Sequence, residues 1–156
     1  MGASRVGVSI DEVLDRVEIN DLLVRYCAAL RTKDLSLLDE VFSADAMIDY
    51  TRIGGSRTGV AETKTWLSMV LGGVEHFDLY VGDSAFAFAA DHSAATVSTT
   101  WHGLFVPAND DPALQVYGHY EDTLVHTDVW RIAERVDLPA ARVIVSLDSE
   151  SSASTT

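Results

Sequence analysis

The hydrophobic pattern of this 156-residue chain changes its period part-way along the sequence. From residue 10 to residue 71 apolar side chains recur at the spacing of amphipathic helices, whereas from residue 75 onward apolar and polar side chains alternate as in strands. Helices followed by a run of strands indicate an α+β fold, with the helices packed on an antiparallel sheet. No repeat or domain boundary interrupts the pattern, so we predict one domain over residues 9–148 and a disordered tail over residues 149–156.

The first predicted helix starts with a capping box. Ser9 can accept a hydrogen bond from the backbone amide three residues later, and the Glu12 carboxylate can accept one from the backbone amide of Ser9. Apolar residues then follow one helical phase over residues 10–17 and a second phase over residues 19–30. We therefore expect either a bend near Val17 or a first turn that packs elsewhere.

Two shorter helices and a series of strands complete the pattern. Asp34 can cap a second helix over residues 35–42, and a third helix over residues 61–71 ends at the glycine pair that follows it. The predicted strands cover residues 46–50, 75–81, 84–89, 94–106, 114–126 and 129–136, with a last edge strand over residues 142–147.

The charge balance limits the partners of this chain. Lys and Arg number 11 against 24 Asp and Glu, which gives a formal net charge of −13. Such a chain repels nucleic-acid phosphates and anionic membrane surfaces, so we expect neither as a partner. No signal-peptide pattern or long apolar run is present, which favours a cytoplasmic location.

The residues that usually hold cofactors show no regular spacing. Five His and 24 carboxylates are present, but no cluster has the spacing of a zinc or calcium site. Glycine-rich phosphate loops and the serine-nucleophile motif are absent from the sequence as well. We therefore expect chemistry without a metal or an organic cofactor.

A series of short motifs follows one another along almost the whole domain. They are Asp21-Leu22-Leu23-Val24-Arg25-Tyr26, Asp34, Val41-Phe42-Ser43-Ala44-Asp45-Ala46, Asp49-Tyr50, Trp66, Glu75-His76-Phe77, Trp101-His102, Gly118-His119-Tyr120-Glu121-Asp122 and Val129-Trp130-Arg131-Ile132. Their order resembles that of SnoaL-like domains in the nuclear transport factor 2-like superfamily. The resemblance implies a cone-shaped α+β fold, in which three N-terminal helices pack on a curved antiparallel or mixed sheet. It also implies a homodimer or homotrimer.

Within that superfamily the chain is most similar to scytalone dehydratase and the related bile-acid dehydratases. The likeness implies that Tyr50, His76 and His102 are catalytic residues in an apolar pocket, and that Tyr26 lies nearby. These enzymes carry an Asp late in the first helix, whereas the matching position here is Arg31. We expect Arg31, if it points inward, to bind an anionic group of the substrate or to stabilise an enolate.

The residue types suit proton transfer beside a carbonyl group. A histidine titrates near neutral pH and can act as a base or an acid, while a tyrosine donates a hydrogen bond without ionising. Alternation places His102 on the strand face opposite Trp101, a face that suits either the inside of a pocket or an exposed surface. The same alternation puts His76 on an exposed face, so only the resemblance brings it into the pocket.

The remaining candidates have structural as well as functional interpretations. Tyr26 and Tyr50 are equally suited to being buried core residues with one hydroxyl hydrogen bond each. Asp122, which shares a strand face with Tyr120, either orients a catalytic histidine or pairs with Arg131 or Arg135 on the next strand, and the ion pair is favoured. With Trp66 on the third helix, we group Tyr26, Arg31, Trp66, Tyr120 and Asp122 as candidate substrate-binding residues.

These observations predict a lyase or isomerase without a cofactor, with dehydratase- or cyclase-like chemistry on a small, largely apolar, polyketide- or steroid-like molecule. A first alternative is a non-catalytic module of the same fold that binds a small molecule or forms oligomers. A second is an epoxide hydrolase, which calls for an Asp-Arg-Asp arrangement that the sequence pattern does not locate.

Overall fold

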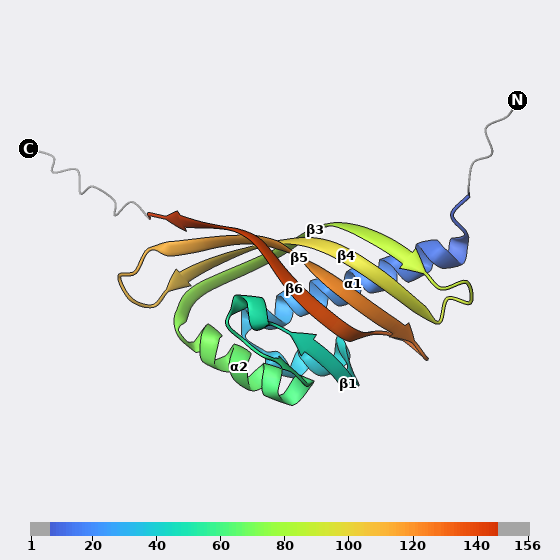
Figure 1. Ribbon diagram of the computed structural model, residues 1–156, viewed down its shortest axis with the longest axis horizontal. Helices are drawn as coiled ribbons and strands as arrows, with labels where there is room; N and C mark the ends of the chain where they lie inside the picture. Colours follow the sequence, from blue (N-terminus) through green and yellow to red (C-terminus); the bar gives the residue numbers. More distant parts are fainter. Residues whose placement is uncertain (1–6, 147–156) are drawn as a thin grey trace, which may run out of the picture.

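The computed structural model describes residues 7–146 and contains a six-stranded sheet, two α-helices and two 3-10 helices. Figure 1 shows the helices gathered in the first half of the chain and the long strands in the second, which confirms the α+β class. The predicted tail over residues 149–156 and the end of the strand predicted over residues 142–147 lie outside the described residues. In chain order the elements are α1 (Ile10–Thr32), η1 (Leu35–Glu40), β1 (Phe42–Asp49), η2 (Thr51–Ile53), β2 (Arg57–Thr58), α2 (Val60–Gly72), β3 (Val74–Phe88), β4 (Ala94–Pro107), β5 (Ala113–His126) and β6 (Trp130–Val145).

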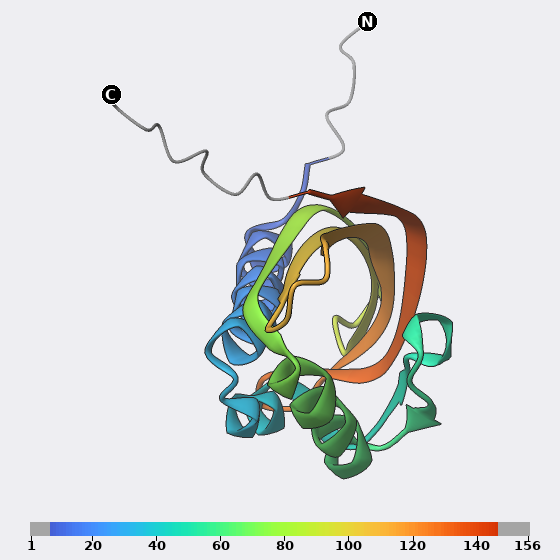
Figure 2. The ribbon, with the colours of Figure 1, turned by 90° about the vertical axis from the view of Figure 1, so that its left-hand side faces the viewer.

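The sheet is mixed, curved and unclosed. Its strand order is β2-β1-β6-β5-β4-β3, and every neighbouring pair is antiparallel except β1 with β6, which run parallel. Figure 2 shows the sheet curling around an interior, with α1 running along one flank. Since β3 to β6 are joined by short turns, neighbours in sequence are also neighbours in the sheet.

Helix α1 begins as the capping box predicts, because the backbone amide of Glu12 donates a 3.1 Å hydrogen bond to Ser9 Oγ. It is one uninterrupted helix, so the change of hydrophobic phase near Val17 does not mark a break. Instead the two phases lie on different sides of the helix. The residues of the second phase, such as Ile19 and Leu23, are buried, whereas Ile10 and Val17 of the first phase are exposed.

Four elements differ from the predicted ones. Strand β3 is continuous through the turn predicted at residues 82–83, because a register shift between Val81 and Ser84 absorbs the extra residues. Strand β6 continues past the predicted end at Val136 and joins the separately predicted edge strand. The second predicted helix is the 3-10 helix η1, and β1 starts at Phe42, ahead of the predicted start.

One apolar core lies between α1, α2 and the inner face of the sheet. Side chains that alternate along β4, including Val97 and Trp101, are buried, while their neighbours on the outer face are partly or fully exposed. Cys27 is buried in this core. None of the helices in the described part of the chain is long and apolar enough to cross a membrane.

Candidate functional site

The inner face of the sheet and the two α-helices enclose a cavity of about 260 Å³. Most of its wall is apolar or aromatic, and within the described residues the only charged side chains in the lining are those of Asp137 and Arg142. A mostly apolar cavity with few polar groups is typical of a small-molecule site. The lining residues are Tyr26, Leu30, Tyr50, Ile53, Trp66, Leu67, Val70, Leu71, Phe77, Leu79, Trp101, Phe105, Leu114, Val116, Tyr120, Asp137 and Arg142.

Two tyrosines from different elements form a hydroxyl pair in this wall. Tyr26 comes from α1 and Tyr50 from the residue that follows β1, and their hydroxyl oxygens lie 2.5 Å apart. Burial raises the pKa of both phenols well above the usual value. Both therefore keep their protons at neutral pH, and the pair retains a hydroxyl proton to donate to a ligand.

Asp137 is the only carboxyl group that lines the cavity among residues 7–146. It is almost completely buried, and its Oδ1 accepts a 3.1 Å hydrogen bond from the indole Nε1 of Trp101. Burial raises the pKa of Asp137 to about 7, although the positive charge of Arg135 opposes the shift. This carboxyl group is therefore partly protonated at neutral pH and can both take up and release a proton.

A buried arginine holds the aromatic residues of the site. Arg135 donates two hydrogen bonds to the Asp122 carboxylate, from Nε at 2.8 Å and from Nη2 at 2.6 Å, and both side chains are fully buried. Its guanidinium carbon lies 3.9 Å from the ring centroid of Tyr120 and 4.4 Å from that of Tyr26. The structural interpretation of Asp122, an ion pair with Arg135, is thus confirmed.

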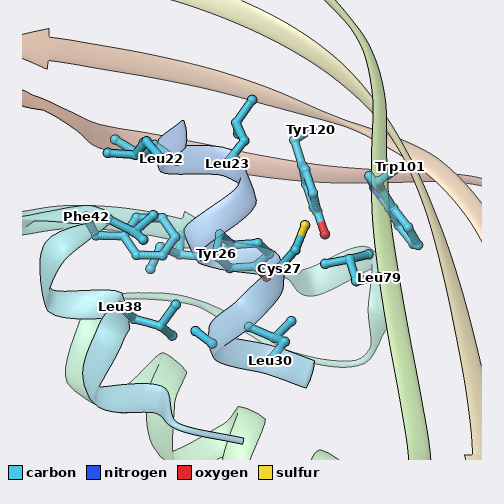
Figure 3. Packing of buried hydrophobic residues seen from close by; sticks show 14 of the residues in the cluster. Leu22, Leu23, Tyr26, Cys27, Leu30, Leu38, Phe42, Leu79, Trp101 and Tyr120 are labelled. Atoms are coloured by element: carbon cyan, nitrogen blue, oxygen red, sulfur yellow. The ribbon is translucent and has the colours of Figure 1, made fainter. Parts of the chain in front are cut away.

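Figure 3 shows the side chain of Tyr120 extending from the sheet toward the turn of α1 that carries Tyr26 and Cys27, with Trp101 on its other side. The Tyr120 ring centroid lies 5.6 Å from that of Trp101 and 5.8 Å from that of Tyr26. These contacts fix the aromatic rings around the cavity, so its polar groups are held in defined positions.

Of the predicted site residues, Tyr26, Tyr50, Trp66 and Tyr120 line the cavity. Trp66 packs its ring 5.6 Å from that of Tyr50. The motifs that carry the family likeness contain all four, and the fold brings them together.

His76 and Arg31 lie outside the cavity lining. The side chain of His76 is 57% exposed on the outer face of the sheet, where Nε2 lies 2.7 Å from Asp78 Oδ2. Arg31 pairs with the same carboxylate, with Nε 3.3 Å from Oδ1 of Asp78. Contrary to what the resemblance implies, His76 does not point into the pocket, because alternation along β3 turns Phe77 and Leu79 inward and His76 outward. Arg31 does not point inward either, since its side chain pairs with Asp78.

His102 also lies on the outer face. On β4 the Trp101 side chain points into the cavity, so the next residue must point away from it. The imidazole ring of His102 stacks on Tyr117, with ring centroids 4.5 Å apart and planes 2° apart. The catalytic roles predicted for the two histidines stay predictions, without a cavity contact to support them.

Three residues that bring polar groups to the cavity, Trp101, Asp137 and Arg142, were not among the predicted site residues. Asp137 and Arg142 lie in a segment where the sequence pattern assigns no strand or only an edge strand, since Pro139 interrupts the alternation. Trp101 was noticed only as the neighbour of His102. The signal that could have identified Trp101 as a cavity residue is its place on the buried face of β4, opposite His102.

The described part of the chain contains no group of three or more His, Cys, Asp or Glu side chains arranged to hold a metal ion. The polar groups of the cavity are therefore a carboxyl, phenols, an indole and a guanidinium. Together they can bind an apolar molecule, donate hydrogen bonds to it and exchange a proton with it.

Sequence comparison links the chain to proteins of known family. The family model described as "SnoaL-like domain" matches residues 11–136. Uncharacterized proteins of Mycobacterium tuberculosis and Mycobacterium bovis are 36% identical to the chain over 132 residues, which is 83% of this chain and 88% of each relative.

Solved structures with the same fold include enzymes. A hexachlorocyclohexane dehydrochlorinase, LinA type 2, superposes with a TM-score of 0.79 at 13% identity and covers 94% of this chain and 99% of its own. A scytalone dehydratase-like protein from Novosphingobium aromaticivorans gives 0.77 at 18% identity, covering 87% and 91%. A nuclear transport factor 2-like protein from Salmonella enterica serovar Typhimurium gives 0.67 at 14% identity, covering 92% and 99%.

Proposed function

This chain belongs to the SnoaL-like domain family, and from that premise we propose that it is a lyase or isomerase that works by proton transfer without a cofactor. The observation that carries the proposal is Asp137, a buried carboxyl group in an apolar cavity that also contains the hydroxyl pair of Tyr26 and Tyr50. The dehydratase-like and dehydrochlorinase neighbours, whose named reactions are eliminations, support the same class of reaction.

In the proposed reaction Asp137 is the general base. Its carboxylate takes a proton from the carbon beside a ketone, and the Tyr26–Tyr50 pair donates a hydrogen bond to the ketone oxygen as that oxygen gains negative charge. The C–H electron pair becomes the new C=C bond. Asp137 then returns its proton to a β-hydroxyl group, which leaves as water, or to another carbon, which gives an isomer.

The apolar wall favours both steps. Trp66, Phe77 and Phe105 belong to the lining and exclude water, which strengthens the hydrogen bond to the oxyanion. Because the pKa of Asp137 is about 7, the carboxylate and the acid are both well populated at neutral pH.

The size and wall of the cavity suit a compact, largely apolar bicyclic or polycyclic ketone, in line with the polyketide- or steroid-like substrate expected from the family. Arg142 adds one positive charge to the lining and is exposed to solvent. We assign it the role of binding an acidic substituent at the solvent-facing side of such a ligand.

Proton transfer can be tested with 2-tetralone and 4-hydroxy-2-tetralone. Exchange of the α-protons of 2-tetralone in D₂O, followed by mass spectrometry, reports the first step alone. Loss of water from 4-hydroxy-2-tetralone gives 2-naphthol, whose fluorescence reports the whole elimination. We expect both reactions with the wild-type protein, and we expect Asp137→Asn and Tyr50→Phe to lower the rates by about 100-fold or more.

His76→Ala and His102→Ala serve as matched controls, since neither side chain lines the cavity. They should keep the wild-type rates, with folding of every variant checked by circular dichroism. Wild-type rates in Asp137→Asn, or their loss in a histidine variant, would refute the assigned base. Thermal stabilisation by both ketones without exchange would instead identify a non-catalytic binding module.

A second candidate, epoxide hydrolysis, is favoured by one observation. The Asp-Arg-Asp arrangement that it calls for has a counterpart here, because Arg135 pairs with Asp122 and interacts electrostatically with Asp137. Asp122 does not line the cavity, however, so it lacks contact with a water molecule bound there. Diol formation from indene oxide by the wild-type protein, lost in both Asp137→Asn and Asp122→Asn, would establish this activity.

A further inference from the structure

A fully buried ion pair lies next to Asp137 and outside the cavity lining. In the antiparallel register of β5 and β6, Asp122 faces Arg135. Tyr120 faces Asp137 at the next position of the same inner face. The side chains of Asp122 and Arg135 are 0% exposed, and neither belongs to the lining. The proposed reaction uses the phenols and Asp137, and leaves this ion pair without a role.

Folding stability alone is a poor explanation for the ion pair. Removing two charges from water costs about as much as their attraction gains, and an apolar pair of similar size is often at least as stabilising. One guanidinium nitrogen, Nη1 of Arg135, is also buried without a hydrogen-bond partner among residues 7–146. A buried donor without a partner lowers stability. A contribution to the reaction is the better explanation.

The guanidinium of Arg135 contacts the rings that lead to both reacting groups of the site. Its Cζ lies 4.4 Å from the ring centroid of Tyr26, whose hydroxyl belongs to the hydroxyl pair. It lies 3.9 Å from that of Tyr120, whose ring stacks on Trp101 at an angle of 18°. Trp101 in turn donates the hydrogen bond to Asp137, and Figure 3 shows it beside Tyr120. One buried cation thus holds the donor side and the base side of the site together.

A cation this close to Asp137 also has a disadvantage for the reaction. Burial raises the pKa of Asp137 most, the positive charge of Arg135 opposes that rise, and the negative charge of Asp122 adds to it. A guanidinium without a counter-charge would act at full strength in this apolar interior and stabilise the carboxylate. Asp137 would then be a weaker base. Asp122, which accepts hydrogen bonds from Nε and Nη2 of Arg135, supplies the counter-charge.

The other titratable groups around Asp137 are neutral or open to solvent. Burial raises the pKa of the phenols and the thiol that lie around it, namely those of Tyr26, Cys27, Tyr50 and Tyr120. Arg142, the other charged residue of the cavity lining among residues 7–146, is exposed and therefore screened by water. Burial raises the pKa of Asp122 too, but its two hydrogen bonds from Arg135 oppose the rise and keep the pair ionic at neutral pH. Within the described residues, the ion pair is therefore the main source of charge at Asp137.

Building on the proposed function, we propose that Asp122 is a positioning residue for the reaction, because it neutralises the arginine that holds the aromatic rings of the site in place. Asp122 does not touch the cavity, and it acts through Arg135 alone. Arg135 fixes the geometry of the donor and the base, and Asp122 prevents the charge of Arg135 from weakening that base. The pH at which the protein works therefore depends on a carboxylate outside the cavity.

Asp122→Asn tests this role, since the amide keeps the shape of the side chain and an oxygen that can accept a hydrogen bond from Arg135. The rate of α-proton exchange of 2-tetralone is measured from pH 5 to pH 9. For the wild-type protein the rate should rise with a midpoint near the Asp137 pKa of about 7. In Asp122→Asn the midpoint should fall by about one pH unit, and the weaker base should lower the plateau rate about threefold.

The two pH profiles should therefore cross. At pH 5 the variant has about tenfold more Asp137 carboxylate, and its roughly threefold weaker base leaves it about threefold faster than the wild-type protein. At pH 9 it should be about threefold slower. A purely structural role for Asp122 would lower the rate at every pH and leave the midpoint in place, and that result would overturn the inference.

Glu121→Gln is the matched control. Glu121 is the residue before Asp122 on β5, lies on the outer face with its side chain 47% exposed, and carries the same charge. The variant should keep the wild-type profile, since water screens the charge that it removes. A midpoint that falls equally in Glu121→Gln and Asp122→Asn would reveal an effect of net charge and would count against the inference.

The double variant Asp122→Leu/Arg135→Met provides a test in which no buried charge is left unpaired. It replaces the ion pair by apolar side chains of similar size, an exchange that is often neutral or stabilising. Arg135 acts on Asp137 more strongly than Asp122 does, so removing both charges should raise the midpoint above the wild-type value. A lowered or unchanged midpoint in the double variant, with folding checked by circular dichroism, would contradict the assigned roles.

NMR spectroscopy of isotope-labelled aspartate carboxyl groups separates this inference from the proposed function. It follows the titration of Asp137 without a substrate, and Asp137→Asn identifies the signal. A wild-type protein that exchanges no protons would refute the proposed reaction, whereas a lower NMR midpoint in Asp122→Asn would still establish that Asp122 controls Asp137. Exchange by the wild-type protein, with the same midpoint in Asp122→Asn by rate and by NMR, would leave the function standing and overturn the inference alone.

Discussion

The Asp137 carboxyl group should lower the stability of the protein at neutral pH. Its pKa is about 7 in the folded state and near 3.9 in the unfolded chain, so between these values the folded state holds a proton that the unfolded state has released. The free energy of unfolding should therefore fall as pH rises from 4 to 7, by on the order of 4 kcal/mol.

The Asp137→Asn variant tests this assignment, since its amide does not titrate and its oxygen can still accept the hydrogen bond from Trp101. Urea unfolding at several pH values from 4 to 8.5 should show the variant more stable than the wild-type protein at pH 8 and similar at pH 4. If the difference in unfolding free energy between the variant and the wild-type protein stays constant across this range, the carboxyl group titrates normally. The variant should therefore gain stability and lose activity, as expected where a functional group is held in an environment that is unfavourable for folding.

Arg142 should contribute to ligand affinity through charge alone. Arg142→Ala is expected to weaken binding of 2-naphthoate by about fivefold, as for a partly exposed charge-assisted hydrogen bond, and to leave binding of neutral 2-naphthol unchanged. Fluorescence titration measures both. Arg57→Ala removes the same charge outside the cavity lining and should have no effect; equal losses for the two ligands would point to altered packing.

The residue types of the site were easier to predict than whether each side chain points into the cavity. Tyr26 and Tyr50 were found through family likeness, and the structure places both in the cavity lining. His76 was misplaced because family likeness outweighed the alternation that puts it on the outer face. His102 was misplaced because alternation alone does not show which face of its strand lines the cavity. Asp137 was missed because no pattern around Pro139 indicates on which side of the sheet it lies.

At the scale of elements, the junction of β5 and β6 depends on one glycine. A Cβ atom on Gly118 would lie 2.7 Å from the carbonyl oxygen of Leu138 and 2.9 Å from both Cα of Pro139 and Cζ2 of Trp101. Since two of these atoms belong to the backbone, they cannot move aside easily. Gly118→Ala should destabilise the protein by roughly 1–3 kcal/mol, as measured by urea unfolding.

Gly72→Ala is the matched control for this substitution, because a Cβ atom added there, at the end of α2, would have no heavy atom within 4 Å. It should be neutral or slightly stabilising, since alanine has less freedom in the unfolded chain. An equal loss of stability in both variants would show that close packing around Gly118 is unimportant.

The first turns of α1 are tied to the far ends of the strands by a polar cluster. Asp15 accepts a hydrogen bond from the indole Nε1 of Trp130 at 2.9 Å and lies 2.5 Å from His92 Nδ1. The hydrogen bond with Asp15 raises the pKa of His92. Burial would raise the pKa of Asp15, but its hydrogen bonds with His92 and Trp130 outweigh that effect and lower it.

This pair predicts a pH-dependent stability contribution. The raised pKa of His92 means that its contribution is fully present below pH 6.5 and is lost as pH rises through the folded-state value. His92→Asn suits the positive φ of 56° at this position. It should cost more stability at pH 5.5 than at pH 9, measured against the wild-type protein by urea unfolding; a larger cost at pH 9 would contradict the assigned ion pair.

Helices and strands were predictable from the sequence where each one has a clear hydrophobic period. The capped start of α1 and the alternation of β4 and β5 needed no tertiary information. The continuity of β3 and β6 did, because Gly82-Asp83 or a proline predicts a turn unless a neighbouring strand accommodates it with a register shift. The parallel pairing of β1 with β6 joins distant segments and has no local signal.

At the scale of the whole molecule, the excess of acid over base should make the folded state sensitive to salt. The 24 acidic and 11 basic side chains repel one another on balance, and the compact state suffers more from this repulsion than the expanded chain. The exposed ion pairs, such as Arg57 with Glu134 and Lys64 with Asp39, oppose this trend because salt weakens them. Each of them contributes between zero and about 1 kcal/mol.

We expect the repulsion to dominate, since most of the acidic side chains among residues 7–146 lack a basic partner close enough to form an ion pair. The net charge of −13 acts on all of them. Raising NaCl from about 10 mM to 300 mM shortens the Debye length from about 30 Å to below 10 Å. The melting temperature should therefore rise, by roughly 2–4 °C for each kcal/mol of repulsion removed. Scanning calorimetry at several NaCl concentrations measures this change. A melting temperature that falls with salt would show that the surface ion pairs outweigh the net charge.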